Sequence, residues 1–247
     1  MTTRNNEIEI LKLLEESGIT ENYNEVPHNF YNKEIFIKTP LNTTNTNNFS
    51  LSEAANKAKN LIKDITNIND LQNTIQTFTE SPLFKHASHI ITGTGTASPT
   101  LLVITETPSS EEDRSGENLT GETGELLKKI LSAIHCSTET NTFVLPASPY
   151  RAPGGRLPSK EEIEITSPFL FKFIELLKPQ VILTMGALPM NLLLNKDCSI
   201  AEIRGTWQKY NDIDLMPTFS LQFLLNNNEA KRKIWNEDLQ FLMKKLG

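Results

Sequence analysis

The stretch LLVITETPSSEEDRSGENLTGETGELL, residues 101–127, indicates the fold more clearly than any other part of the chain. It starts as a short apolar strand, passes through a Pro/Ser turn and an acidic loop, and ends in an amphipathic helix expected over 122–134. The same alternation continues to the C-terminus. Further strands are expected at 142–145, 181–185 and 213–219, and further helices at 159–177, 187–194 and 229–246.

Short, nearly all-apolar strands between helices are typical of a parallel sheet that is covered on both faces. The pattern therefore predicts an α/β fold, a three-layer αβα sandwich with a central parallel four-stranded sheet. In such sheets a ligand binds beyond the carboxyl ends of the strands. The loops expected at that edge are 106–121, 146–158, position 186 and 218–225, so a functional site is expected among them.

Residues 1–80 differ from the rest, and we interpret them as a helical, Asn-rich N-terminal extension that precedes a domain over 81–247. A first helix is expected over 6–17, and the polar tract 42–48 is expected to be a flexible linker. The Ser50–Glu53 capping box predicts the start of a second helix that ends near Ile65, and a third is expected over 70–78. The simplest role for this extension is to pack on the main domain.

Composition excludes some classes of function. With 38% hydrophobic and 22% charged residues, the chain has the balance of an ordinary soluble globular protein. Its net charge of −6 means that any nucleic-acid binding depends on a local basic patch. Its apolar runs are too short to span a membrane, and its N-terminus does not read as a signal peptide. Two cysteines, Cys136 and Cys198, make no disulfide framework, so a cytoplasmic location without membrane attachment is expected.

Three later motifs belong with residues 101–127: SPYRAPGGRLPSKEEI at 148–163, VILTMGAL at 181–188 and IRGTW at 203–207. In this order the motifs resemble those of the uracil-DNA glycosylase superfamily, in particular its iron–sulfur (family 4) type. The resemblance covers residues 71–247. The N-terminal extension also resembles that of alphaproteobacterial members. The resemblance implies the uracil-DNA glycosylase-like fold and a role in base-excision repair of DNA.

A glycosylase removes a base that has been flipped out of the duplex into a pocket. That pocket needs a stacking aromatic ring, a group that reads the base edge, and a group that stabilises the departing base. The family begins this site with Gly-Glu-Ala-Pro-Gly after a strand, and this chain has Thr105-Glu106-Thr107-Pro108-Ser109 there. The resemblance thus implies Glu106 as a catalytic residue and Pro108 as part of the base pocket.

Three other positions depart from the family. Leu119 stands where a phenylalanine would stack on uracil, and Pro146 or a neighbour stands where an asparagine would read the base. Ser220 stands where a histidine would stabilise the departing base; its hydroxyl can donate one hydrogen bond but carries no positive charge. Leu119 and Pro146 are therefore expected in the base pocket and Ser220 among the catalytic residues, with weak or lost uracil excision.

DNA, single- or double-stranded, is the expected partner, and the protein is expected to be a monomer. Basic side chains in the matching motifs are expected to contact its phosphates. These are Arg151 and Arg156 in the Arg/Pro loop, Arg204 in the Arg-Gly-x-Trp motif, and Lys231, Arg232 and Lys233 in the C-terminal helix.

The family also holds a four-iron cluster on four cysteine thiolates. This chain has two cysteines, and Ser81 stands where one ligand cysteine is expected. The sequence therefore predicts no cluster, no other cofactor and no metal site. His86 and His89 lie three residues apart, but they are interpreted as solvent-facing side chains.

Two functional classes remain open from the sequence, with a third as a weaker alternative. The chain is either a working glycosylase with a reduced site or a non-catalytic descendant of the fold that binds DNA or a protein. A phosphate- or nucleotide-binding α/β module is a weaker alternative, because the turn after residues 101–105 has neither a GxGxxG nor a GxxxxGK motif.

Overall fold

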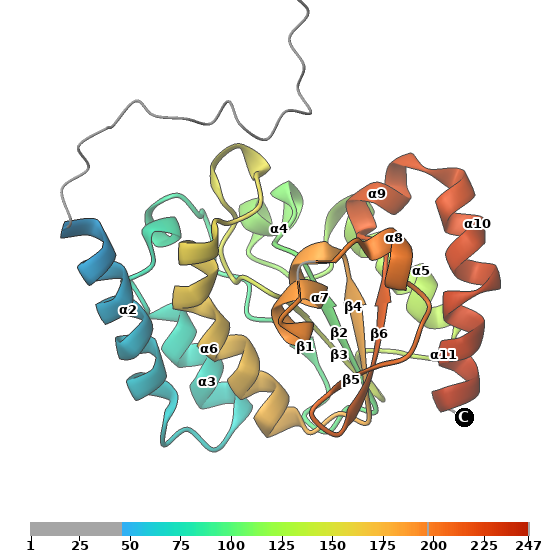
Figure 1. Cartoon of the computed structure of the whole chain (residues 1–247), viewed down its shortest axis with the longest axis horizontal. Coiled ribbons are helices and arrows are strands. Elements are labelled where there is room, and N and C mark those ends of the chain that lie inside the picture. The colour runs from blue at the N-terminus through green and yellow to red at the C-terminus, as the bar shows by residue number, and fades with distance from the viewer. Residues whose placement is uncertain (1–45, 197, 247) are drawn as a thin grey trace, which may run out of the picture. The chain divides into compact units, whose positions relative to one another are not determined.

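The computed structural model describes residues 46–196 and 198–246, which form one compact α/β unit (Figure 1). Its sheet has six strands within these residues, in the order β1-β3-β2-β4-β6-β5. The strands are β1 (Thr94–Gly95), β2 (Leu101–Thr105), β3 (Thr142–Pro146), β4 (Val181–Met185), β5 (Gln208–Tyr210) and β6 (Ile213–Thr218). The four central strands are parallel, as predicted, and β1 and β5 add antiparallel edges. These two edge strands have two and three residues, too few for a hydrophobic pattern to reveal them.

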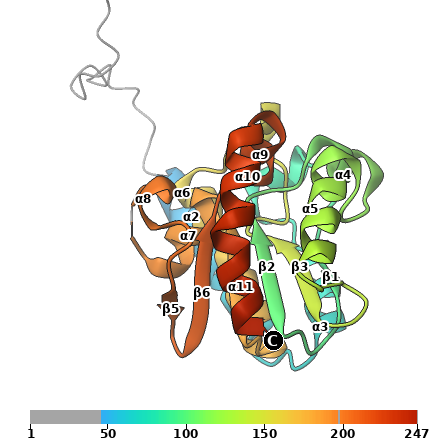
Figure 2. The same cartoon turned by 90° about the vertical axis from the view of Figure 1, so that its right-hand side faces the viewer.

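Helices cover both faces of the sheet and make the predicted three layers. Along each strand, side chains alternate between the faces: Leu102 and Ile104 point to one core, Leu101 and Val103 to the other. The first core is covered by α2 (Thr46–Ile62), α3 (Ile68–Gln76), α6 (Lys160–Leu177) and α7 (Ala187–Leu194). The second is covered by α5 (Gly121–Ala133), α9 (Leu221–Asn226), α10 (Asn228–Asn236) and α11 (Asp238–Leu246), as Figure 2 shows.

Helices α2 and α3, which lie within the expected N-terminal extension, belong to the compact unit. They share a core with α6, and Ala58, Ile75 and Phe169 are all buried members of that core. Helix α2 starts at Thr46, inside the tract expected to be a linker and four residues before the Ser50–Glu53 capping box. Its apolar stripe is buried against α6, and tertiary packing of this kind outweighs local start signals. The helix expected over 6–17 lies outside the described residues.

The single helix expected over 229–246 is two helices, α10 and α11, which break at Glu237 (φ −118°, ψ −80°). The break brings the fully buried Asp238 to the start of α11. None of the described helices is both long enough and apolar enough to cross a membrane.

The loops that follow β2 and β4 diverge at the carboxyl edge of the sheet. Strand β2 lies between β3 and β4, and the chain leaves β2 toward α5 but leaves β4 toward α7 on the opposite face. Such a divergence opens a crevice at the ends of the strands. The short helix α4 (Ser110–Ser115), the 3-10 helix η2 (Pro153–Gly155) and α9 lie around this edge (Figure 1).

Candidate functional site

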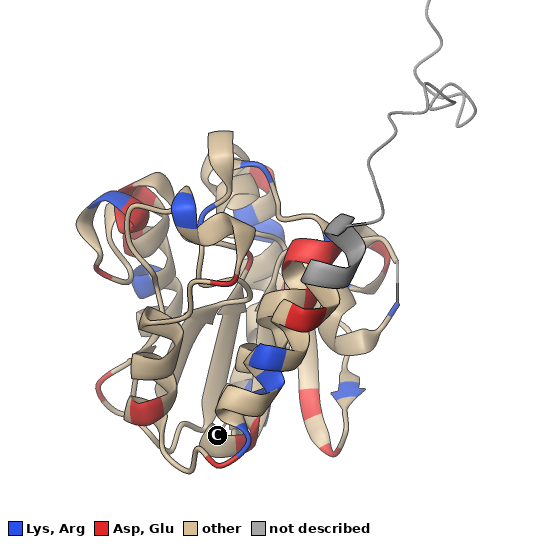
Figure 3. Cartoon of the chain, turned by 90° about the vertical axis from the view of Figure 1, so that its left-hand side faces the viewer, with Lys and Arg blue, Asp and Glu red and all other residues tan. Residues whose placement is uncertain are grey.

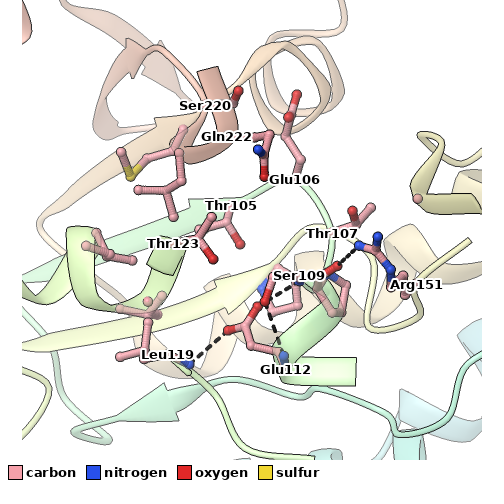
Figure 4. Close-up of a pocket in the computed structure, with 18 of the residues that line it drawn as sticks. Thr105, Glu106, Thr107, Ser109, Glu112, Leu119, Thr123, Arg151, Ser220 and Gln222 are labelled. Atoms are coloured by element: carbon pink, nitrogen blue, oxygen red, sulfur yellow. Dashed lines mark hydrogen bonds between the residues drawn. The ribbon is translucent and has the colours of Figure 1, made fainter. Parts of the chain in front are cut away.

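A cavity of about 590 Å³ opens at the carboxyl ends of β2, β3 and β4. Six of the residues predicted for the site line it: Glu106, Pro108, Leu119, Pro146, Arg151 and Ser220. They come from loops that are far apart in the sequence. Figure 4 shows Ser220 and Glu106 at one end of the pocket and Leu119 and Glu112 at the other.

Glu106 is the first residue after β2, and its side chain reaches the start of α7. Its Oε1 atom accepts a hydrogen bond from the Leu188 N–H at 3.5 Å. Gly186 makes this approach possible, because a Cβ atom there would lie 2.5 Å from the same oxygen. Burial raises the pKa of the Glu106 carboxyl, and the N–H groups of Leu188 and Ala187 lower it by less. The carboxyl is therefore held in one place, with a proton affinity above that of an exposed glutamate.

The loop that carries Leu119 is held by the carboxylate of Glu112. Ser109 and Glu112 form the capping box of α4, and the second Glu112 oxygen, Oε1, accepts the N–H of Leu119 at 2.8 Å. Leu119 has a φ of 60°, which is unusual for a leucine. Its carbonyl carbon would lie 2.1 Å from a Cβ at position 124, so Gly124 permits this close approach. The Leu119 side chain therefore forms a buried, aliphatic part of the pocket wall.

The inner end of the pocket is apolar. Pro146 ends β3 opposite Thr105 of β2, and its side chain is buried. Leu127, Leu145 and Met185 line the cavity with it. None of these four side chains can donate a conventional hydrogen bond to a base.

Ser220 begins α9 and caps it. Its Oγ atom accepts a hydrogen bond from the Phe223 N–H at 3.3 Å. This capping use leaves the hydroxyl hydrogen able to donate one bond toward the pocket. Ser220 therefore has a structural role at the place where the resemblance implied a catalytic one.

Arg204 lies beneath this loop and is not available to DNA. The guanidinium is buried and pairs with Glu237 at 2.9 Å and with Asp238. Asp238 also accepts the hydroxyl hydrogen of Thr218, and the Arg204 guanidinium lies 5.1 Å from the centroid of the Phe219 ring. We therefore withdraw Arg204 as a phosphate contact, since these partners use its charge and hold the end of β6 in place. We call Arg204, Asp238 and Thr218 the clamp.

The other basic residues predicted to contact DNA differ in whether their side chains already have partners within the protein. Arg151 lines the pocket and donates a hydrogen bond to the Pro108 carbonyl at 2.9 Å. Its guanidinium forms no ion pair with a described carboxylate. Arg156 makes a two-point pair with Glu162, at 2.7 and 2.8 Å. Lys231 donates to the Leu225 carbonyl at the end of α9.

Arg232 and Lys233 are exposed on α10 and form no ion pair with any other described residue. Together with Arg151 and Lys231, they are the predicted DNA contacts that form no ion pair with a described residue, whereas Arg156 and Arg204 are paired.

Sequence reasoning missed several lining residues, above all Gln222 and Phe223 at the start of α9. Gln222 lies beside Glu106 and Ser220 in Figure 4, and Phe223 is 45% exposed at the rim. Asn118 and Thr123 also line the cavity. A signal for α9 was present, because Ser220 before an apolar run is a common N-cap pattern.

The fold and the pocket define a class: an αβα protein with a ligand pocket where the loops after β2 and β4 diverge. Residues 92–240 match the model of the Uracil DNA glycosylase superfamily, and the chain belongs to that superfamily. It is 29% identical over 170 residues to a type-4 uracil-DNA glycosylase of Thermotoga maritima, which is 66% of this chain and 85% of that protein. A type-4 uracil-DNA glycosylase of Saccharolobus solfataricus is 30% identical over 166 residues, 64% of this chain and 76% of its own length.

These relatives correct the prediction about cofactors. Type-4 enzymes are the iron–sulfur type to which the motifs were compared, so the expectation of a protein without a cofactor is contradicted and we withdraw it. The residues available are a separate matter. Cys136 is buried, Cys198 is half-buried, and Ser81 caps the 3-10 helix η1 (Pro82–Lys85). No group of three or more His, Cys, Asp or Glu in the described ranges is placed to hold a metal, so these residues do not fit a four-cysteine site.

Proposed function

We propose that this chain binds DNA in base-excision repair and holds one extrahelical base in the pocket, with weak or absent uracil excision. One observation carries the proposal. The positions of the base chemistry, Glu106, Leu119, Pro146 and Ser220, all line one cavity, and three of them lack the expected chemical group. The retained motifs build the pocket, whereas the replaced ones remove its chemistry.

The reaction would break the bond between the base and the sugar, leaving charge on both. Glu106 can orient a water molecule or offset positive charge on the sugar. Ser220 offers the departing anionic base one uncharged hydrogen bond, and Leu119 offers it no ring face. Loss of a single electrostatic donor costs about 3–4 kcal/mol of transition-state stabilisation in other enzymes. Three such losses together explain a slow or absent reaction, even if they do not add fully.

The charge distribution favours a small contact with DNA. Arg151 is the single Lys or Arg that lines the pocket within the described part of the chain. In the view of Figure 3, Lys and Arg are scattered among Asp and Glu and do not form one patch. We therefore propose that Arg151, Arg232 and Lys233 supply the phosphate grip, with lesser parts for Arg156 and Lys231. A monomer in the cytoplasm, acting on single- or double-stranded DNA, belongs to the same proposal, as does the likeness to alphaproteobacterial members.

A non-catalytic role is the second candidate, because both residues proposed for chemistry already have structural uses. Glu106 accepts the first N–H groups of α7, and Ser220 caps α9. A protein that only binds DNA would keep both residues for this reason alone.

A single-turnover assay on uracil-containing single- and double-stranded DNA tests the proposal. We expect excision far slower than by a type-4 uracil-DNA glycosylase measured in parallel. Any residual rate should fall further in Glu106→Ala and should rise in Ser220→His. Rapid excision that survives Glu106→Ala would mean that the site lies elsewhere.

A further inference from the structure

Gln222 is a pocket residue that neither the proposed mechanism nor the family motifs use. It is the second residue of α9, and it lines the cavity next to Glu106 and Ser220 (Figure 4). Its main-chain carbonyl accepts a hydrogen bond from Asn226, at 3.0 Å. Its side-chain amide makes no hydrogen bond to any described residue, so it can turn freely at the pocket.

The backbone that carries this amide is fixed. Ser220 caps α9, and the clamp of Arg204, Asp238 and Thr218 holds the end of β6 that leads into the helix. The side chain is exposed, whereas its attachment point is held by buried ion pairing. Gln222 therefore offers one carbonyl acceptor and one NH₂ donor from a defined place, in either of two orientations.

An amide matches two kinds of base edge. In one orientation it pairs with the N–H and carbonyl of a uracil-type edge, and after a half-turn it pairs with the ring nitrogen and amino group of a cytosine-type edge. An amide that reads a base edge discriminates between uracil-type and cytosine-type edges only when neighbouring groups fix its orientation. The side chain of Glu106 beside it is ambivalent in the same way, since a carboxyl donates when protonated and accepts when ionised.

The inner wall of the pocket cannot read a base edge. Leu119, Pro146 and Met185 offer no side-chain hydrogen bond to a base edge. We propose that Gln222 reads the edge of the bound base in place of an amide at position 146, and that it accepts uracil-type and cytosine-type edges alike. This inference rests on the proposed function, because it requires a base in the pocket.

The test measures binding to DNA duplexes by fluorescence anisotropy. Each duplex carries a central 2′-fluoro-uridine or 2′-fluoro-cytidine, which resists cleavage, opposite an abasic analogue, so that neither base has to break a pair. A third duplex has abasic analogues on both strands. We expect the uracil and cytosine duplexes to bind within about threefold of each other, and both about tenfold more tightly than the third, since one to two hydrogen bonds give such a factor.

Gln222→Leu should remove this gain for both bases without changing the affinity for the third duplex. Asn118→Leu is the matched control, since Asn118 is a second pocket amide with no side-chain hydrogen bond to another described residue, and it should keep the gain. Two results would overturn the inference alone: a gain that survives Gln222→Leu, or uracil preferred over cytosine by more than tenfold. Absence of salt-dependent binding to all three duplexes would overturn the proposed function as well.

Discussion

The two walls of the pocket use their polar groups in opposite ways. On one wall, residues 106–121, the side chains that shape the loop are bonded to one another or to its backbone: Ser109 and Glu112 form a capping box, and Glu112 also holds Leu119, although the amide of Asn118 makes no hydrogen bond to a described residue. On the other wall, residues 218–226, which we call the arm, the residues at the end of β6 are buried and paired. The side chains at the start of α9 are exposed. The clamp fixes Thr218, whereas the side chains of Gln222 and Phe223 are exposed.

This difference means that one wall gives the pocket its shape and the other can recognise a ligand. A wall whose carboxylates and hydroxyls are already bonded offers a ligand mainly shape, because new hydrogen bonds would replace existing ones. A wall whose backbone is held in place and whose side-chain amide is unbonded offers a ligand a hydrogen bond at a defined position. The pocket is therefore shaped by residues 106–121 and read by the arm.

The largest effect should come from the clamp. Asp238→Ala leaves the buried Arg204 guanidinium with a single partner, Glu237, which is half exposed. Leaving a buried charge uncompensated costs about 3–5 kcal/mol, so the free energy of unfolding in denaturant should fall by that amount. Glu237→Ala is the control, and it should cost about 1 kcal/mol or less because that carboxylate is exposed to water. Equal losses in the two variants would mean that Asp238 does not hold the arm.

The next effect should come from the wall that carries Leu119. Gly124→Ala would place a Cβ atom 2.1 Å from the Leu119 carbonyl carbon, so the loop must move. Overpacking of this kind costs about 1–3 kcal/mol, and the backbone contact puts Gly124→Ala at the upper end of that range. The comparison is Gly154→Ala, where nothing lies within 4 Å and only the left-handed φ of 66° is unfavourable, at about 1 kcal/mol. Thermal and denaturant unfolding of both variants would show whether the contact with Leu119 matters.

Much of this architecture could be predicted from the sequence, and the failures have physical causes. The four parallel strands and the helices expected over 159–177 and 187–194 were all predicted, because long apolar periods dominate there. The break in the C-terminal helix was not predicted. It is explained by the burial of Asp238 and its pairing with Arg204, which the local sequence does not show.

The site shows the same limit. The motifs predicted that Glu106, Leu119, Pro146 and Ser220 would lie near one another, because each follows or faces a strand end. Arg204 was misassigned because an arginine in a motif does not reveal its partners, which lie more than 30 positions away at Glu237 and Asp238. Gln222 was missed because its importance depends on what it does not bond, and a sequence does not show that.

A smaller effect concerns Glu106 and pH. Burial raises its pKa above the ordinary 4.5, so ionisation costs the folded protein stability as pH rises from 4.5 through the raised value. Glu106→Gln keeps an oxygen for the Leu188 N–H but cannot ionise. The difference in Tm between this variant and the natural protein should be small at pH 4 and should grow in favour of the variant toward pH 8.

Glu125→Gln is the control for that experiment. The pKa of Glu125 is lowered, chiefly by its hydrogen bond to Lys128, so the stability it gives is present above the unfolded pKa and is lost as pH falls. The Tm difference for this variant should have the opposite sign. A Glu106→Gln difference that does not change with pH would mean that the carboxyl is exposed to water.

The smallest effect should be on DNA binding. Arg151→Ala should flatten the slope of log K against log salt by about 0.7–0.9, which corresponds to one lost phosphate contact. Arg156→Ala should change the slope less, since Glu162 already neutralises that guanidinium. If Arg156→Ala flattens the slope and Arg151→Ala does not, the phosphate path runs outside the pocket.

The most direct measurement of the central claim is the single-turnover rate of uracil excision after restoring the replaced groups together, as Leu119→Phe/Pro146→Asn/Ser220→His. If the scaffold is intact and only its chemistry has been replaced, the restored protein should excise uracil at least about 100-fold faster than the natural one, the typical effect of a single electrostatic donor. Binding of the same DNA should be retained in both proteins. Rapid excision by the natural protein, or no gain in a restored protein that still folds and binds DNA, would contradict the account.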